Sequence, residues 1–315
     1  MILTVTPNPS LDRTYEVASL DRGEVLRASS ERLDPGGKGV NVSRAVAAAG
    51  HPTTAVLPLG GAPGAVIAEL LSGLGIDVTA VKITGQTRSN IAVTEPSGTL
   101  TKINAPGPEL TPAESGLLLD TVRMHALDGD WIACCGSLPR GLGPRWYSDL
   151  VARVHEAGAR VALDTSGPAL LAALHERPEV VKPNAEELAA AVGRPLTTIG
   201  DAVEAARELR SRGAGAVLAS LGADGQLLVD GSGTYFGSAT VATVRSNVGA
   251  GDASLAGFLL AGGTGPEALG AAVAHGAAAV QLPGSVMPTP ADLDPSAVTV
   301  TADVPLHRAL TEPTT

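Results

Sequence analysis

Short apolar runs alternate with helical patterns along most of this chain, and this alternation limits the possible folds more than any other feature. The apolar runs lie at 2–6, 54–59, 131–135, 160–163, 179–182 and 216–220, and the helical patterns lie at 39–49, 64–73, 144–157, 167–175, 185–192 and 201–212. Strands that alternate with helices form βαβ units around a parallel sheet. Because such crossovers are right-handed, we expect a three-layer α/β/α, doubly wound, mostly parallel sheet.

Two segments depart from this alternation. Residues 12–34 contain short β-like stretches at Thr14–Val17 and Val25–Arg32, and residues 88–104 alternate apolar and polar side chains on either side of the turn Glu95–Gly98. Alternation of this kind indicates a sheet with one buried face. We expect a domain over 1–297 that carries both segments as a small β-sheet lid, followed by a loosely held tail over 298–315.

The composition excludes some classes of function. The net charge is −10, and the 315 residues include only two Trp, three Tyr and two Phe. Nucleic-acid binders normally carry a basic face, and single-strand binders need aromatic stacking platforms, so we expect neither. A small anionic substrate remains possible, because a few Lys and Arg residues can form a positive pocket on an acidic surface.

The cysteines and the apolar runs bear on the compartment. Cys134 and Cys135 are adjacent, so a bridge between them would be strained, and we interpret both as buried hydrophobic residues in a reducing compartment. No run of 18 apolar residues occurs in the sequence. We therefore expect a cytoplasmic protein that does not enter a membrane.

The strongest local motif is a glycine-rich turn, Asn247–Ala253, that opens a helical pattern. Backbone N–H groups at such a helix start hold anions, and the helix dipole adds partial positive charge. Asp252 lies in the first helical turn. It either caps the helix or serves as a general base beside a phosphate cradle, the geometry that phosphoryl transfer needs.

Two further motifs precede it. Gly36, Gly37 and Gly39 allow a ligand to approach the backbone closely, next to Lys38 and Asn41. The chain contains no Walker A sequence and no dinucleotide fingerprint after a strand. In the run Lys182–Leu188, Asn184 and Glu187 share a helix face. These two residues either form a capping box or orient a hydrated Mg²⁺.

Several single polar residues lie at strand ends, where open α/β sheets bind ligands. They are Asp12, Arg88, Asn90 and the run Gly136–Pro139. Each of them is also compatible with an ordinary turn. The histidines have no metal-like spacing, so we assign them surface or packing roles.

Taken together and in order, these motifs resemble a known family. Gly36–Asn41 and Val248–Asp252 resemble the two signatures of the ribokinase-like (PfkB-type) carbohydrate kinases, and Asn184 with Glu187 matches the Asn-x-x-Glu motif of that family. The resemblance covers about residues 1–293. The runs Thr6–Asp12, Thr87–Asn90 and Gly136–Pro139 are similar to its phosphosugar branch. It implies an ATP-dependent kinase for fructose 1-phosphate, with tagatose 6-phosphate and fructose 6-phosphate as alternatives.

The resemblance also implies roles for individual residues. Asp252 would be the base, beside an anion hole of Gly249, Ala250 and Gly251. The sugar phosphate would contact Asp12, Arg27, Gly36, Gly37, Lys38, Asn41, Arg88, Asn90 and Ser137. ATP would contact Lys182, Asn184, Ser220, Gly222 and Gly225.

The same resemblance implies cofactors. Mg²⁺ would be held through water by Asn184 and Glu187, and K⁺ by backbone groups at Ser246, Val248 and Gly284. The Ser246-Asn247 pair, Leu282 and Val286 depart from the usual pattern around the K⁺ site. The edge strands of the lid would otherwise be exposed, so we also expect a homodimer formed through the lid.

One hypothesis from a different class remains open. The chain could be a sugar-phosphate sensor that kept the fold and lost turnover. Retention of Asp252 with its full glycine run favours the kinase, because a sensor does not need a base. An oxidoreductase is a distant third possibility, since its dinucleotide fingerprint is absent.

Overall fold

The computed structural model describes residues 1–314, and within them ten strands form one main sheet. Their order is β14-β13-β12-β11-β10-β9-β8-β1-β4-β5. The bounds are β1 Ile2–Val5, β4 Thr53–Leu59, β5 Asp77–Lys82, β8 Trp131–Cys135, β9 Arg160–Asp164, β10 Val180–Val181, β11 Ala216–Ser220, β12 Gln226–Val229, β13 Thr234–Ala239 and β14 Val298–Thr301. Strands β11, β10, β9, β8, β1, β4 and β5 pair in parallel, and β12, β13 and β14 are antiparallel, so the expected mostly parallel sheet is confirmed.

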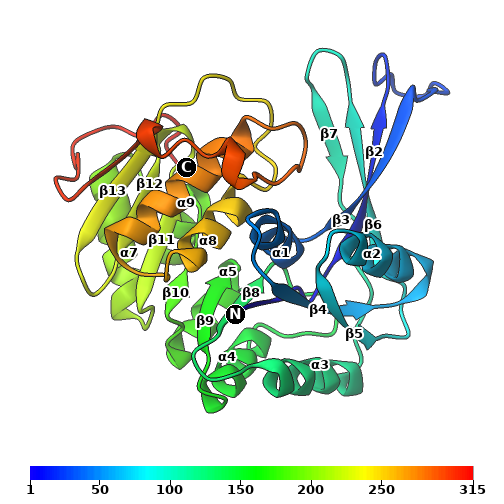
Figure 1. Cartoon of the computed structure of the whole chain (residues 1–315), viewed down its shortest axis with the longest axis horizontal. Coiled ribbons are helices and arrows are strands. Elements are labelled where there is room, and N and C mark those ends of the chain that lie inside the picture. Colours follow the sequence, from blue (N-terminus) through cyan, green and yellow to red (C-terminus); the bar gives the residue numbers. More distant parts are fainter. Residues whose placement is uncertain (315) are drawn as a thin grey trace.

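Helices cover both faces of this sheet (Figure 1). One face carries α3 Pro112–His125, α4 Trp146–Glu156, α5 Gly167–Ala173, α6 Ala185–Val192 and α7 Ile199–Ser211, and the other carries α1 Lys38–Ala48, α8 Ala250–Leu260 and α9 Gly265–Val280. Helix α2, Gly61–Gly73, packs against β4. Short 3-10 turns lie at η1 Leu174–Glu176, η2 Gly222–Asp224, η3 Pro290–Asp292 and η4 Pro295–Ala297.

Alternate residues of the central strands fill the two cores. On β8, Ile132 and Cys134 belong to the core under α3 and α4, whereas Ala133 and Cys135 belong to the core under α8 and α9. This follows from the period of two in a strand, which sends successive side chains to opposite faces. Both cysteines are free and buried, as the sequence predicts.

A second sheet forms the lid and stands beside the main body (Figure 1). Its order is β3-β2-β6-β7, with β2 Ser10–Glu16, β3 Ser30–Gly36, β6 Arg88–Thr94 and β7 Leu100–Ile103. The predicted hairpin over 88–104 is therefore confirmed. Because β2 pairs in parallel with β6, Asp12 lies opposite Asn90. The expected strand at Val25–Arg32 begins instead at Ser30.

The end of the chain differs from the sequence prediction. Residues Val298–Thr301 form β14, which pairs with β13 at the edge of the main sheet, and Leu310 is buried. The prediction of a loosely held tail is wrong for these residues, because an antiparallel ladder and an apolar anchor hold them. The division at residue 297 stays a proposal, since β14 continues the main sheet.

None of the helices within residues 1–314 has the length and apolar character needed to cross a membrane. The 16-residue helix α9 runs through His275 and Gly276, which interrupt its apolar composition.

Candidate active site

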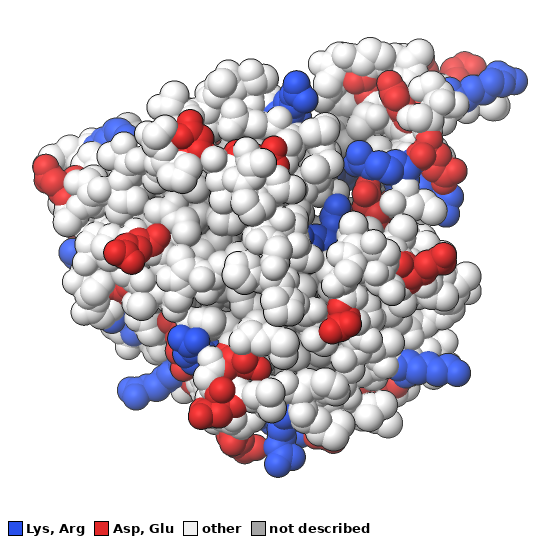
Figure 2. Space-filling view, viewed as in Figure 1, with Lys and Arg blue, Asp and Glu red and all other residues white. Residues whose placement is uncertain are grey.

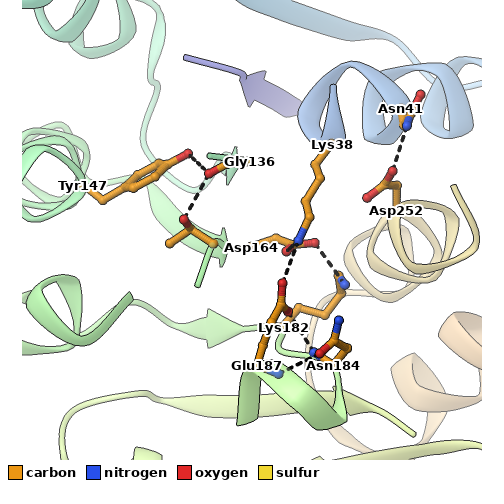
Figure 3. Close-up of polar contacts among 10 residues, drawn as sticks. Lys38, Asn41, Gly136, Tyr147, Asp164, Lys182, Asn184, Glu187 and Asp252 are labelled. Carbon is orange, nitrogen blue, oxygen red and sulfur yellow. Dashed lines mark hydrogen bonds and ion pairs between the residues drawn. The ribbon is translucent and has the colours of Figure 1, made fainter. Parts of the chain in front are cut away.

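The first turns of α1 and α8 face each other, although they are far apart in the sequence. Asn41 on α1 donates from Nδ2 to Asp252 Oδ2 on α8 at 2.8 Å (Figure 3). Gly37 and Gly249 precede these helices with φ of 123° and 80°, values that glycine adopts without strain. No described side chain caps either helix, so the amides of both first turns stay available to an anion.

Asp252 has the environment of a general base. Only 8% of its surface is exposed. Burial, and secondly the charge of Asp164, raise its pKa to about 6, against the opposing effects of Lys182, Asn41 and Lys38. A base whose pKa lies just below the working pH accepts a proton efficiently and is ionised beforehand. This environment favours the base over the simple helix cap.

A buried carboxylate that the sequence motifs do not include lies at the centre of the site. Asp164, at the end of β9, is fully buried and lies 2.7 Å from Lys38 Nζ and 3.0 Å from Lys182 Nζ (Figure 3). Burial opposes ionisation, but the two ammonium groups hold the pKa of Asp164 below its usual value. The pKa values of Lys38 and Lys182 are raised despite burial, chiefly by Asp164, so both lysines carry charge at neutral pH.

Lys182 lies beside the first turn of α8. A Cβ atom at Gly251 would lie 3.2 Å from Lys182 Nζ, so the ammonium borders the backbone there. The ammonium groups of the two lysines face the carboxylates of Asp164 and Glu187, and Asp252 lies near both, so the cluster has no net positive excess of its own. An anion here is attracted chiefly by the uncapped amides and the dipole of the helix start.

Asn184 and Glu187 form the predicted capping box at the start of α6. Asn184 Oδ1 accepts from the Glu187 amide at 2.7 Å, and Glu187 Oε2 accepts from the Asn184 amide at 2.9 Å. The capping interpretation is therefore confirmed. The other oxygen of Glu187 lies 3.3 Å from Lys38 Nζ, so the same side chain also faces the lysine cluster (Figure 3).

The base of the lid supplies a second polar group. Asp12 Oδ1 accepts from Asn90 Nδ2 at 2.9 Å, across the register of β2 and β6. A Cβ atom at Gly36 would lie only 2.3 Å from Asp12 Oδ2, so this position needs glycine. Asp12, Gly36 and Asn90 thus form one group.

Arg88 is fixed by backbone carbonyls. It donates from Nη1 to Ala105 O at 2.8 Å and from Nη2 to Asn8 O at 3.0 Å, while its Nε is buried without a partner among the described residues. Burial lowers its pKa, which nearby Asp12 partly offsets. A solvated turn residue would show none of this. Ser137 lies near this group, 3.5 Å from Asn8 Nδ2.

The run 220–225 follows β11 and lies beside α6. Ser220 pairs with Asn184 through an isolated bridge, which joins the two expected nucleotide contacts. Gly222 and Gly225 have φ of 60° and 126°, so this turn needs glycine at both positions.

Arg27 does not belong to the group of residues around Arg88 at the base of the lid. It is exposed in the loop that joins β2 to β3, away from the base of the lid. The sequence prediction placed it with Arg88, but nothing in a long polar loop fixes where such a side chain lies.

The K⁺ site that we expected at the backbone groups of Ser246, Val248 and Gly284 stays a prediction. Ser246 Oγ accepts from the Val248 amide at 3.1 Å, and this bond does not involve the carbonyl groups of the expected site. The guanidinium of Arg32 borders Gly284, where a Cβ atom would lie 2.5 Å from Nη2. A positive group so close disfavours a bound cation.

The described residues contain no group of three His, Cys, Asp or Glu side chains that could cage a metal. Mg²⁺ keeps several waters and binds through few protein groups, so Glu187 with Asn184 fits a water-mediated contact.

Figure 2 shows Lys and Arg side chains facing the notch between the lid and the main body.

Two site residues escaped the sequence motifs. Asp164 follows the apolar run 160–163, and the same strand-end rule that selects Asp12 also selects it. Arg44 donates to Asn41 Oδ1 at 3.1 Å and so fixes the amide with its Nδ2 toward Asp252. Its spacing of three residues from Asn41 on a helix was the available signal.

Comparisons with known proteins agree with this geometry. Residues 6–292 match a family described as "pfkB family carbohydrate kinase". A 1-phosphofructokinase of Rhodobacter capsulatus is 39% identical over 95% of this chain and 96% of its own length. A crystal structure of phosphofructokinase-2 from Escherichia coli in complex with potassium has a TM-score of 0.88 and 34% identity, over 92% of this chain and 96% of that one. The tetrameric inhibited form of the same enzyme has a TM-score of 0.85 and 34% identity, over 90% and 95%.

Proposed function

The chain belongs to the pfkB family of carbohydrate kinases, and from this premise we propose that it transfers the γ-phosphate of ATP to fructose 1-phosphate. The product is fructose 1,6-bisphosphate. The observation that carries the proposal is the contact between Asn41 and the buried Asp252, at the start of an uncapped helix. A base next to free backbone amides is the arrangement that phosphoryl transfer needs.

Asp252 accepts the proton of the attacking hydroxyl group. As the new oxygen–phosphorus bond forms, the bond from the γ-phosphorus to the bridging oxygen breaks, and its electron pair leaves with ADP. Asn41 Nδ2 donates to Asp252 Oδ2, which leaves Asp252 Oδ1 for the sugar hydroxyl. Arg44 keeps Asn41 in that orientation.

The charge of the transferring phosphoryl group is held by the first turn of α8 and by the lysines. The amides of Ala250, Gly251 and Asp252 donate toward it, as helix N-termini do toward phosphate. Lys182 borders the same turn. We assign Lys38 to this group as well, because its ammonium contacts Asp164 and Glu187 rather than the group around Arg88.

The sugar binds at the base of the lid. Asp12, Asn90 and the backbone of Gly36 and Gly37 hold its hydroxyl groups. Arg88 holds the phosphate already on the sugar, assisted by Ser137, and its remaining N–H groups are the donors. A guanidinium already fixed by two carbonyls loses little freedom on binding, which favours affinity.

The nucleotide lies along the run 220–225 and the start of α6. Ser220, Gly222 and Gly225 approach it through backbone and hydroxyl groups, with Asn184 beside them. Glu187 and Asn184 hold Mg²⁺ through water, and when bound this ion offsets charge on the ATP phosphates. Requirement for K⁺ is tested by replacing it with choline. Because Arg32 borders Gly284, we expect little change.

We further propose that two copies pair through their lid sheets. Leu100 and Ile103 on β7 are 42% and 61% exposed, and Ile91 on β6 is 38% exposed. Apolar edge strands are normally covered, and a second lid would cover these. Ile103→Lys should convert a dimer into a monomer in sedimentation experiments, and a wild-type monomer would contradict the proposal.

An assay that couples ADP release to a dehydrogenase tests the main proposal. It is run separately with fructose 1-phosphate, fructose 6-phosphate, tagatose 6-phosphate and fructose. We expect the highest kcat/KM with fructose 1-phosphate. A higher value with another phosphosugar would transfer the assignment to that sugar. Tight binding of a phosphosugar without turnover of any would support the sensor instead.

A further inference from the structure

The C-terminal strap, residues 302–314, crosses the run 220–225. It is anchored on the segment before α7, because Leu310 N donates to Thr197 O at 2.9 Å and Ile199 N donates to Arg308 O at 3.0 Å. Leu310 is buried, which adds an apolar anchor. The strap is therefore fixed to the main domain at several points.

Asp224 joins the strap to that run. Its Oδ2 accepts from the Thr311 amide at 2.7 Å, and its Oδ1 accepts from Thr311 Oγ1 at 3.0 Å. Its backbone oxygen accepts from Arg308 Nη2 at 2.8 Å. The Asp224 side chain is only 9% exposed, whereas Arg308 and Thr311 lie at the surface, so the three bonds join a largely buried carboxylate to an exposed strap.

The other side of the run rests on β13. A Cβ atom at Gly225 would lie 2.4 Å from Gly237 O, so the two backbones are in close contact. The Arg308 guanidinium stacks on the Phe236 ring, 4.8 Å from its centre. The turn Gly222–Gly225 is therefore held between a strand and the strap.

We propose that Asp224 and Thr311 are positioning residues that fix this turn for the nucleotide. The inference rests on the proposed function, which assigns Gly222 and Gly225 to ATP. Neither Asp224 nor Thr311 touches a substrate in this proposal. Glycine-containing turns lose much conformational entropy when they become ordered, and the strap orders this one before ATP arrives.

Substitution of Asp224 by alanine tests the proposal. We expect Asp224→Ala to raise KM for ATP about tenfold, below the ~10²-fold that a misplacement of about 1 Å can cost. KM for fructose 1-phosphate should stay within about twofold of the wild-type value. A uniform loss of nucleotide binding raises only the KM for ATP. Thr311→Val keeps the amide and removes one hydroxyl bond, so it should raise KM for ATP about three- to fivefold.

Asp294→Ala is the matched control. Asp294 also accepts from a backbone amide and a hydroxyl, both of Ser296, but only within its own turn. It should leave both KM values unchanged. If Asp224→Ala does not fold, Thr311→Val carries the test alone.

Hydrogen exchange and ADP calorimetry give readouts besides activity. In Asp224→Ala, amides 221–226 should exchange faster, and ADP should bind about tenfold more weakly, in line with the KM for ATP. Faster exchange with unchanged ADP affinity would reduce the strap to a structural element and overturn the inference. A wild-type protein that binds no nucleotide would instead overturn the proposed function itself.

Discussion

The main sheet and the lid sheet lie next to each other but bury their strands differently. Strands β1 and β8 are buried along their whole length, with helices on both faces. On the lid, β7 carries Leu100 and Ile103 largely exposed. Groups that need a fixed geometry are held in the main body, since Asp164 ends the buried strand β9 and Asp252 lies on α8, which packs over the main sheet. The groups that we propose for sugar recognition, Asp12, Asn90 and Arg88, lie on the lid strands β2 and β6.

The main body should show the largest effect. Asp252→Asn keeps the shape of the site and removes the proton acceptor, so we expect kcat to fall about 10²- to 10⁴-fold. Retention of more than about a tenth of wild-type kcat would reduce Asp252 to a helix cap.

The same variant should be more stable than the wild type. The pKa of Asp252 is about 6 in the folded protein, so ionisation of this buried group costs folding energy above that pH. The neutral amide removes this cost, and we expect a gain of about 1–3 kcal/mol at pH 7.5, measured by urea unfolding. A less stable variant would show that the carboxylate is favourably held.

The junction of the two sheets should show the next largest effect. Arg88→Ala should lower kcat/KM for fructose 1-phosphate about 10- to 100-fold, since one hydrogen bond to a charged group is worth ~1.5–3 kcal/mol. Free fructose has no phosphate, so its slow turnover should hardly change.

Arg140→Ala is the control for this variant. Arg140 donates to Gly107 O at 3.3 Å and supports the same loop as Arg88, which bonds to Ala105. Its loss loosens the loop without removing the proposed phosphate contact. Equal losses on both sugars, or equal losses in both variants, would refute the assignment of Arg88 to the phosphate.

A smaller effect is expected from pH. Because Asp252 acts in its ionised form, kcat/KM should fall below about pH 6, by roughly tenfold at pH 5. Phosphosugars also titrate near pH 6, so the profile is repeated with free fructose, which lacks that group. A descending limb near pH 4 with both sugars would contradict the raised pKa.

The lid should show the smallest change, and only in dynamics. A kinase excludes water around ATP, so we expect slower hydrogen exchange at 12–34 and 88–104 when fructose 1-phosphate and a non-hydrolysable ATP analogue are bound. Equal exchange with and without ligands would show that this sheet is a fixed wall.

The sequence predicted the parallel strands well and the antiparallel edge poorly. Strands β1, β8 and β9 are continuous apolar runs followed by helices, which is a strong pattern. No helix separates β12 from β13, and β14 begins only after η4, so the βα pattern could not reveal them. Helix α3 was also missed, although Thr111 and Glu114 form a capping box at its start.

The candidate site was predictable where residue type and glycine conformation act together. Asn41 and Asp252 each lie in the first turn of a helix that begins after a glycine-rich turn, and these turns are visible in the sequence. Their meeting across 211 residues joins α1, which follows β3 of the lid sheet, to α8, which follows a loop after β13, so the βα pattern alone does not predict it. Asp164 stands alone after its strand and has no such motif. Arg27 could not be placed, because its position depends on a loop with no periodicity.

The Lys and Arg side chains around the notch have a consequence for how substrates arrive. The whole chain carries a net charge of −10, so an approaching phosphate ester is repelled at long range and attracted only near the notch. At physiological ionic strength, charges are screened beyond about 8 Å. Moderate salt should therefore suppress the distant repulsion before it weakens the local attraction. We expect the association rate of a sugar phosphate to rise with added salt, which is the opposite of its behaviour toward a basic protein.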